Sequence, residues 1–171
     1  MSDTPTMELE HSYRLRIFEA GPGRMVRPSA VADCLQDIAA AHAVVLGFSA
    51  QRFADLGLAW VLARMRLALH RVPEPGTDIT VRTWPSAVDR AVARREFEIT
   101  GPAGEPLGAA TQAWVALDVA RRRLARMPDF VRFGEHEHTR PRPLEFEGKS
   151  PPRLAEHTRQ ARVLARRADT D

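Results

Sequence analysis

From residue 57 to residue 86 the sequence reads GLAWVLARMRLALHRVPEPGTDITVRTWPS, and the same character continues through RREFEIT (94–100) and GAATQAWVALD (108–118). These segments are rich in β-branched and apolar residues and contain all three tryptophans of the chain. Residues that favour turns separate them at Pro73–Gly76, Pro85–Ser86 and Gly101–Gly104. Runs punctuated in this way are typical of successive antiparallel strands.

A long helix is predicted before these strands. One helical face is apolar at Val31, Leu35, Ile38, His42 and Val45. Ser29 is suited to cap the start of this helix, and Gly47 is suited to end it. One long helix followed by a meander of long strands predicts an α+β fold in which a sheet wraps around the helix. His42 is either a core residue with a satisfied hydrogen bond or a catalyst, and the pattern leaves both open.

The flanking segments divide the chain. Residues 11–19 alternate between apolar and polar, which predicts a strand with one wet face. Residues 134–156 are rich in proline and lack periodicity, so we expect a linker there after a first domain over residues 1–133. Residues 157–171 then read as the first strand of a second domain.

The composition favours a soluble globular protein. The chain has 171 residues, of which 44% are hydrophobic and 27% charged, and no run is long and apolar enough for a membrane span. Its only cysteine, Cys34, excludes an internal disulfide, and its first residues are polar, so we expect a cytoplasmic protein. The arginines lie scattered along strand-like runs without aromatic stacking residues, which argues against nucleic-acid binding. His136-Glu137-His138 is an incomplete metal motif, and we expect no metal and no cofactor.

Several of these segments together resemble the acyl-acyl carrier protein thioesterase family, the enzymes that release fatty acids in bacteria and plant plastids. The resemblance covers most of the chain, and its motifs follow in the family's order. They are LQDIAAAH (35–42), GLAWVLARM (57–65), the Pro73-x-x-Gly76-Thr77 and Thr83-Trp84 pair, RREF (94–97), AWVALD (113–118) and Arg126-Met127-Pro128.

This resemblance implies a tandem of two hotdog domains, each a long helix wrapped by an antiparallel sheet, of which this chain supplies the N-terminal half. The first hotdog is associated with the acyl chain, and the second carries the catalytic residues in an Asp-x-Asp-x-Asn-x-His motif. Asp169-Thr170-Asp171 is similar to the opening of that motif, which places Asp171 at the position of the catalytic aspartate. We expect the asparagine and histidine to follow beyond residue 171.

The implied activity is thioester hydrolysis on acyl carrier protein in fatty acid biosynthesis, a step of lipid metabolism. An alkyl chain needs a deep apolar groove, and the candidates for lining it also fit an ordinary core. They are Trp60, Leu62, Met65, Leu67, Leu35 and Ile38. The carrier protein is acidic, so exposed arginines are expected to steer it. The candidates are Arg64, Arg66, Arg94 and Arg95.

Two other functions are compatible with the sequence. The chain can be a hotdog module that binds acyl groups without hydrolysing them, and it would then pair its sheet with a second copy. It can also be another hotdog enzyme, such as a dehydratase or an acyl-CoA thioesterase, in which His42 or Asp37 would be catalytic. In every case a hotdog is expected to pair with another hotdog, either in a homodimer or with a second domain.

Overall fold

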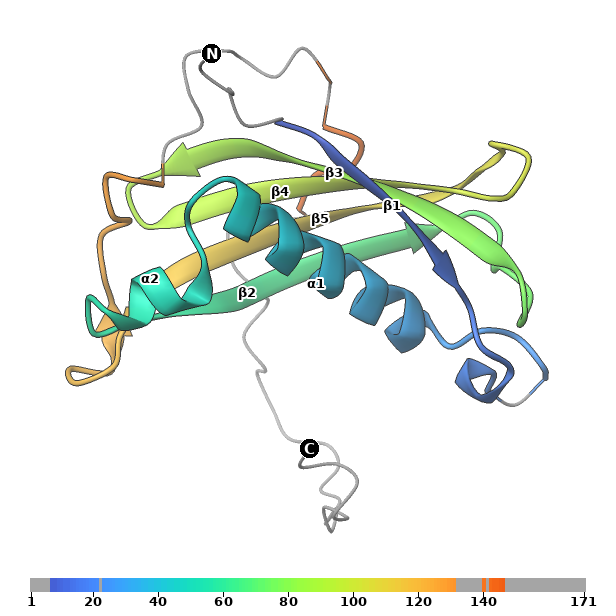
Figure 1. The fold of residues 1–171 in the computed structure, drawn as a ribbon, viewed down its shortest axis with the longest axis horizontal. Coiled ribbons are helices and arrows are strands. Elements are labelled where there is room, and N and C mark those ends of the chain that lie inside the picture. The colour runs from blue at the N-terminus through green and yellow to red at the C-terminus, as the bar shows by residue number, and fades with distance from the viewer. Residues whose placement is uncertain (1–6, 22, 132–139, 141, 147–171) are drawn as a thin grey trace, which may run out of the picture.

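A computed structural model of the protein describes residues 7–21, 23–131, 140 and 142–146. One curved antiparallel sheet wraps around one long helix, as Figure 1 shows. The elements in chain order are β1 (Leu9–Arg14), the 3₁₀ helix η1 (Ile17–Glu19), α1 (Pro28–Val45), α2 (Ala50–Ala54), β2 (Leu58–Leu69), β3 (Asp78–Asp89), β4 (Val92–Thr100), β5 (Pro106–Asp118) and β6 (Arg123–Leu124). The strand order is β1-β3-β4-β5-β2, and the short β6 pairs with β5. The predicted α+β arrangement is confirmed.

Helix α1 lies against the inner, concave face of the sheet. Its buried side includes Val31, Leu35 and Ile38, which pack with inner-face residues of β3 and β4 such as Val81 and Phe97. Val45, at the end of the predicted apolar stripe, is 53% exposed, whereas its neighbours Ala43 and Leu46 pack in a second apolar cluster with Phe48. These contacts join α1 and the sheet into one folded unit.

Specific residues explain where α1 begins and where it ends. The helix begins at Pro28 and its N-cap residue is Arg27, so the prediction of Ser29 as the cap is wrong. Proline is well suited to the first helical position, because its fixed φ matches the helix and its missing N–H has no intrahelical acceptor there. Gly47, with φ +79°, ends the helix as predicted.

Strand β1 is shorter than the sequence pattern predicts. It ends at Arg14, and Ile17, an apolar residue within the predicted strand over residues 11–19, is 79% exposed in η1. Local hydrogen bonds explain the difference, because the Arg16 amide donates to the Glu19 carboxylate at 2.6 Å and the Glu19 amide donates to the Arg16 carbonyl at 3.0 Å. These bonds close a tight turn where an alternating pattern alone would continue the strand.

Strand β2 lies at one edge of the sheet and β1 at the other. Residues 58–70 fit a helix or a strand by periodicity, and the strand prediction is confirmed over Leu58–Leu69. A register shift between Leu62 and Arg64 bends β2 where it pairs with β5. None of the helices in the described ranges is long and apolar enough to cross a membrane.

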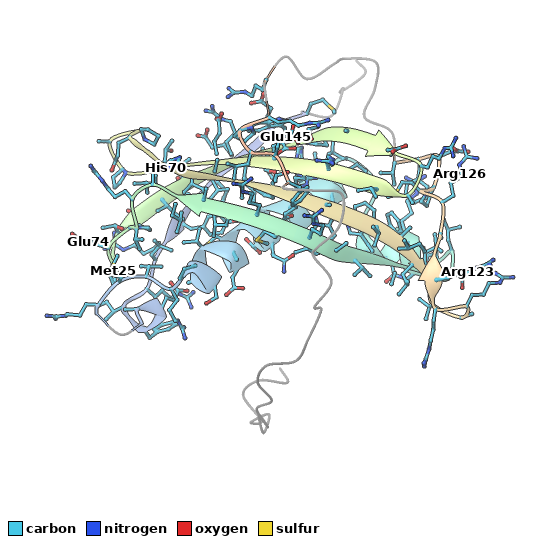
Figure 2. The ribbon with its side chains drawn as sticks, turned by 180° about the vertical axis from the view of Figure 1, so that it is seen from behind. Met25, His70, Glu74, Arg123, Arg126 and Glu145 are labelled. Carbon is cyan, nitrogen blue, oxygen red and sulfur yellow. The ribbon has the colours of Figure 1, made fainter. Side chains whose placement is uncertain are left out.

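Part of the predicted linker packs on the outer face of the sheet. We call Arg140 together with residues 142–146 the outer strap. Arg140 donates from Nε to Glu8 at 2.9 Å and from its Nη1 to Glu98 at 3.1 Å. Glu145 pairs with Arg94 of β4, on the side of the sheet away from α1 (Figure 2). The predicted strand over residues 157–171, Asp171 and the His136–His138 motif lie outside the described residues.

Candidate functional site

A cavity of about 520 Å³ lies between the second half of α1, the start of α2 and the inner face of the sheet. Three alanines of α1, Ala39, Ala40 and Ala43, line one side of it. Because each of these side chains is a single methyl group, the helix leaves space where leucine would fill it. The sequence feature that accounts for this cavity is therefore the set of small side chains on one face of α1.

The opposite wall of the cavity is aromatic. Trp60 of β2 and Trp114 of β5 stack with their ring centroids 5.6 Å apart and their planes at 8°. Phe53 of α2 tilts against Trp60 at 4.6 Å, and Phe48 also lines the cavity. The Trp114 indole N–H donates to the Gln112 side-chain oxygen at 2.8 Å, which fixes the orientation of the ring. Most of the cavity surface is thus apolar.

Arg95 of β4 is the charged residue in the cavity lining, and it is only 5% exposed. One terminal nitrogen, Nη1, contacts His42 Nδ1 at 2.9 Å and donates to the Thr83 hydroxyl oxygen at 3.2 Å. Burial lowers the pKa of Arg95 to about 9, so the guanidinium is still a cation at neutral pH. No carboxylate among the described residues pairs with it.

His42 is completely buried on α1 and does not line the cavity. A guanidinium can only donate, so its contact with Arg95 makes His42 Nδ1 the acceptor. The geometry is that of a core histidine with a satisfied ring nitrogen. Asp37 is exposed on another side of α1, where it accepts a hydrogen bond from the Tyr13 hydroxyl at 2.9 Å.

Of the six residues predicted to bind the acyl chain, only Trp60 lines this cavity. Leu35 and Ile38 are 0% and 1% exposed in the main core, and Met65 and Leu67 pack against that core further along β2. These four residues pack in the helix–sheet interface away from the cavity. Leu62 is half-buried on β2 without lining the cavity, and a substrate-binding role for these five residues remains a prediction.

The four arginines expected to be exposed for a carrier protein are not free surface residues. Arg95 is buried on the inner face, so that expectation is wrong for it. Arg64 and Arg94 place their guanidinium carbons 4.5 and 5.3 Å from the ring centre of Phe146, and Arg94 also pairs with the Glu145 carboxylate at 3.7 Å. Arg66 donates to the Glu145 carbonyl. The outer strap therefore occupies all three remaining arginines.

The outer face also contains a buried acid. Glu96 has no exposed surface, and its Oε1 accepts a hydrogen bond from the Ser86 hydroxyl at 2.6 Å. Its Oε2 has no hydrogen-bond partner among the described residues. Desolvation raises the pKa of Glu96 above its usual value. In the described part of the chain no three potential metal ligands gather, here or at the cavity.

A sequence model described as the acyl-ACP thioesterase N-terminal domain matches residues 7–133. The chain is 33% identical over 137 residues to oleoyl-acyl carrier protein thioesterase 2, chloroplastic, of Arabidopsis thaliana, covering 74% of this chain and 37% of the relative. It is 30% identical over 156 residues to the palmitoyl-acyl carrier protein thioesterase, chloroplastic, of Cuphea hookeriana, covering 86% and 38%. The chain thus spans little more than a third of the curated relatives that it matches.

Solved structures of thioesterases superpose on this chain. The 12:0-ACP thioesterase from Umbellularia californica superposes with a TM-score of 0.66 at 28% identity, covering 74% of this chain and 51% of that one. An acyl-ACP thioesterase from Bacteroides thetaiotaomicron gives 0.73 at 21% identity, covering 86% and 58%. A gentisyl-coenzyme A thioesterase gives 0.64 at 11% identity and is covered over its entire length. The hotdog fold is confirmed.

Proposed function

Because the chain belongs to the acyl-ACP thioesterase family, we propose that it supplies the acyl-binding half of an enzyme that releases free fatty acids from acyl carrier protein in fatty acid biosynthesis. The observation that carries this proposal is the cavity walled by Ala40, Ala43, Trp60 and Trp114. Each methylene group moved from water into such a site contributes about 0.8 kcal/mol. A cavity of about 520 Å³ is large enough for several of them.

The catalytic groups are proposed to lie outside the described residues. No carboxylate or imidazole lines the cavity in the part of the chain that the structure describes. Hydrolysis of a thioester needs a group that activates water, and carboxylates and histidines are the usual ones. This supports placing catalysis in a second hotdog, with Asp171 at the position of its aspartate, as the resemblance implies.

The second hotdog is proposed to pair with the free edge of β2. This strand has 12 residues and is bonded to β5 on one side only within the described residues. A long edge strand exposes a row of backbone donors and acceptors that another strand can satisfy. The partner is either the second half of the same protein or a second copy of this chain.

The acyl group is proposed to arrive on acyl carrier protein. The outer strap occupies Arg64, Arg66 and Arg94, so the arginines at the β5–β6 end of the sheet are better placed to meet an acidic partner. Arg123 and Arg126 project from this end (Figure 2) and both are exposed. We also propose a cytoplasmic location, which the single cysteine supports.

The acyl-binding role is tested with Ala40→Phe, which narrows the cavity from an exposed position on α1. Binding of C8, C12 and C16 acyl carrier proteins to the 171-residue chain is measured by calorimetry. We expect the variant to lose affinity for the longest chain by about tenfold and to retain C8, because the end of a long chain would meet the phenyl ring. Ala41→Phe is the matched control, since Ala41 is exposed on α1 but does not line the cavity.

Hydrolysis of the same thioesters distinguishes the alternatives. Binding without turnover by this chain agrees with a separate catalytic half or with a non-hydrolysing homodimer, and the oligomeric state separates these two. Turnover of acyl-coenzyme A that Asp37→Ala or His42→Ala abolishes would instead indicate an independent hotdog enzyme. Equal binding by both phenylalanine variants at every chain length would contradict the acyl-cavity proposal.

A further inference from the structure

Arg95 is a buried cation with unused hydrogen-bond donors. A guanidinium has five N–H groups, and only those of Nη1 have acceptors among the described residues. Both of these acceptors, His42 Nδ1 and the Thr83 hydroxyl, are neutral. The charge of Arg95 is therefore buried at 5% exposure without a counter-ion in the described part of the chain.

A second unused donor lies beside Arg95. Gln112 of β5 is directly opposite Arg95 of β4 in the strand register, so the two side chains stand next to each other on the inner face. Gln112 is completely buried, and its oxygen accepts the Trp114 indole N–H. Its amide nitrogen, Nε2, has no hydrogen-bond partner among the described residues. Two neighbouring buried side chains thus have donors for which the described residues offer no acceptor.

Buried charges are normally paired, and an unpaired buried amide also costs free energy. The cost at Arg95 is removed if a ligand brings an anionic acceptor into the cavity, whereas Gln112 stands behind Arg95 without lining the cavity. Arg95 lines the cavity, so an occupant of the cavity can reach its guanidinium. The aromatic and alanine walls indicate that the rest of such an occupant is apolar.

We infer that the cavity binds a free fatty acid with its carboxylate on Arg95, next to Gln112, and its alkyl chain between α1 and the two stacked tryptophans. The alkyl part of this inference rests on the proposed acyl-binding role of the cavity. A carboxylate fits better than a neutral oxygen, because it supplies the missing charge and can accept two parallel N–H bonds from one guanidinium. Fatty acids are the product of the proposed reaction, so this site would retain product and compete with the acyl substrate.

The inference is tested with decanoate and 1-decanol, which share an alkyl chain and differ in charge. Their affinities for the 171-residue chain are measured by calorimetry at pH 7.5, below the micelle concentration of decanoate. We expect decanoate to bind at least about tenfold more tightly than 1-decanol. In Arg95→Met the preference is expected to disappear while 1-decanol still binds, which also reports that the variant is folded with its cavity intact.

Arg82→Met is the control, since Arg82 lies on the outer face, where it pairs with Glu10. This variant should keep the preference for decanoate. Equal affinities in the unchanged protein, or an unchanged preference in Arg95→Met, would overturn the inference and leave the acyl cavity in place. Methyl 3-hydroxydecanoate binding as tightly as decanoate would overturn it too, because a neutral oxygen would then suffice. Failure of both decanoate and 1-decanol to bind would overturn the acyl-binding proposal as well.

Discussion

Each face of the sheet contains one buried ionisable side chain, and the surroundings of the two side chains differ. Arg95 and Glu96 are consecutive in β4 and are 5% and 0% exposed, yet the strand alternation sends their side chains to opposite faces. Arg95 lines a cavity on the inner face, whereas Glu96 lies on the outer face beside Ser86. The two opposite charges cannot pair with each other, so each face must accommodate its own.

The outer strap covers part of the outer face, whereas no described segment fills the inner cavity. Arg94 and Arg142 lie close enough to Glu96 to lower its pKa, against the larger effect of desolvation. Arg140 of the outer strap lies over the ring of Trp84, with 5.6 Å between the guanidinium carbon and the ring centre. We therefore expect the outer contacts to contribute to stability and the residues around the inner cavity to contribute less. Four predictions test this division.

The largest effect is expected for Trp84→Ala. Trp84 is completely buried on the outer face, and truncation of such a ring leaves a cavity that costs about 3–5 kcal/mol. Trp60→Ala is the matched variant on the inner face, where the ring is only half-buried and already borders open space. Urea unfolding should give a clearly smaller loss for Trp60→Ala. Equal losses would contradict the division between the faces.

A smaller effect is expected for Arg140→Ala. This change removes two ion pairs, to Glu8 and Glu98, and uncovers Trp84, so we expect a loss of about 1–2 kcal/mol in the free energy of unfolding. Arg126→Ala, at an exposed arginine, should change stability by less than about 0.5 kcal/mol. If both variants unfold at the same urea concentration, the outer strap does not stabilise the sheet.

Glu96→Gln should increase stability by about 1 kcal/mol at pH 8 and lose this advantage at pH 4. The pKa of Glu96 is raised in the folded state, so the folded protein binds a proton that the unfolded chain has already released. Stability from this group is therefore present below the unfolded pKa and is lost as the pH rises towards the folded pKa. Glutamine is neutral at every pH in this range, so the Glu96→Gln variant does not lose stability in this way as the pH rises.

Urea unfolding of both proteins from pH 4 to pH 8 measures the effect. Glu74→Gln, at an exposed turn residue visible in Figure 2, is the control and should show no gain at pH 8. A gain for Glu96→Gln of the same size at both pH values would mean that protonation of Glu96 is not its cause.

The smallest change in stability is expected for Arg95→Met, within about 1 kcal/mol in either direction. The variant loses the contacts to His42 and Thr83, but it also removes a buried cation that has no counter-ion among the described residues, and the two effects oppose each other. Chemical unfolding at pH 7 measures the balance. A loss above about 3 kcal/mol would reveal that Arg95 has an anionic partner within the protein.

Local patterns in the sequence predicted the elements well. The apolar stripe through Val31, Leu35 and Ile38 predicted α1, and all three residues are buried. The turn after His70 favoured a strand over a helix for residues 58–70, which β2 confirms. Each of these inferences depends on residues that are close in sequence, where period and turn chemistry act directly.

The site was harder to predict, because it is formed by contacts between distant residues. The cavity combines small residues of α1 with Trp60 and Trp114, and no single segment contains that combination. The outer strap depends on Arg140 reaching Glu8, which is 132 residues away. For Arg95 a signal was present, since alternation in β4 places it on the same face as Phe97. Arginine is rarely buried, so the residue type pointed to the surface while the alternation pointed to the inner face.

The placement of the three tryptophans gives the protein intrinsic fluorescent reporters of its two faces. Trp60 and Trp114 form the stacked pair of the cavity wall, and Trp84 lies beneath Arg140 on the opposite face. A ligand entering the cavity would change the emission of the stacked pair and leave Trp84 as an internal reference. Detachment of the outer strap would change the emission of Trp84 and leave that of the stacked pair unchanged. Single Trp→Phe replacements can assign the two signals, so occupancy and docking can be followed in solution without an added dye.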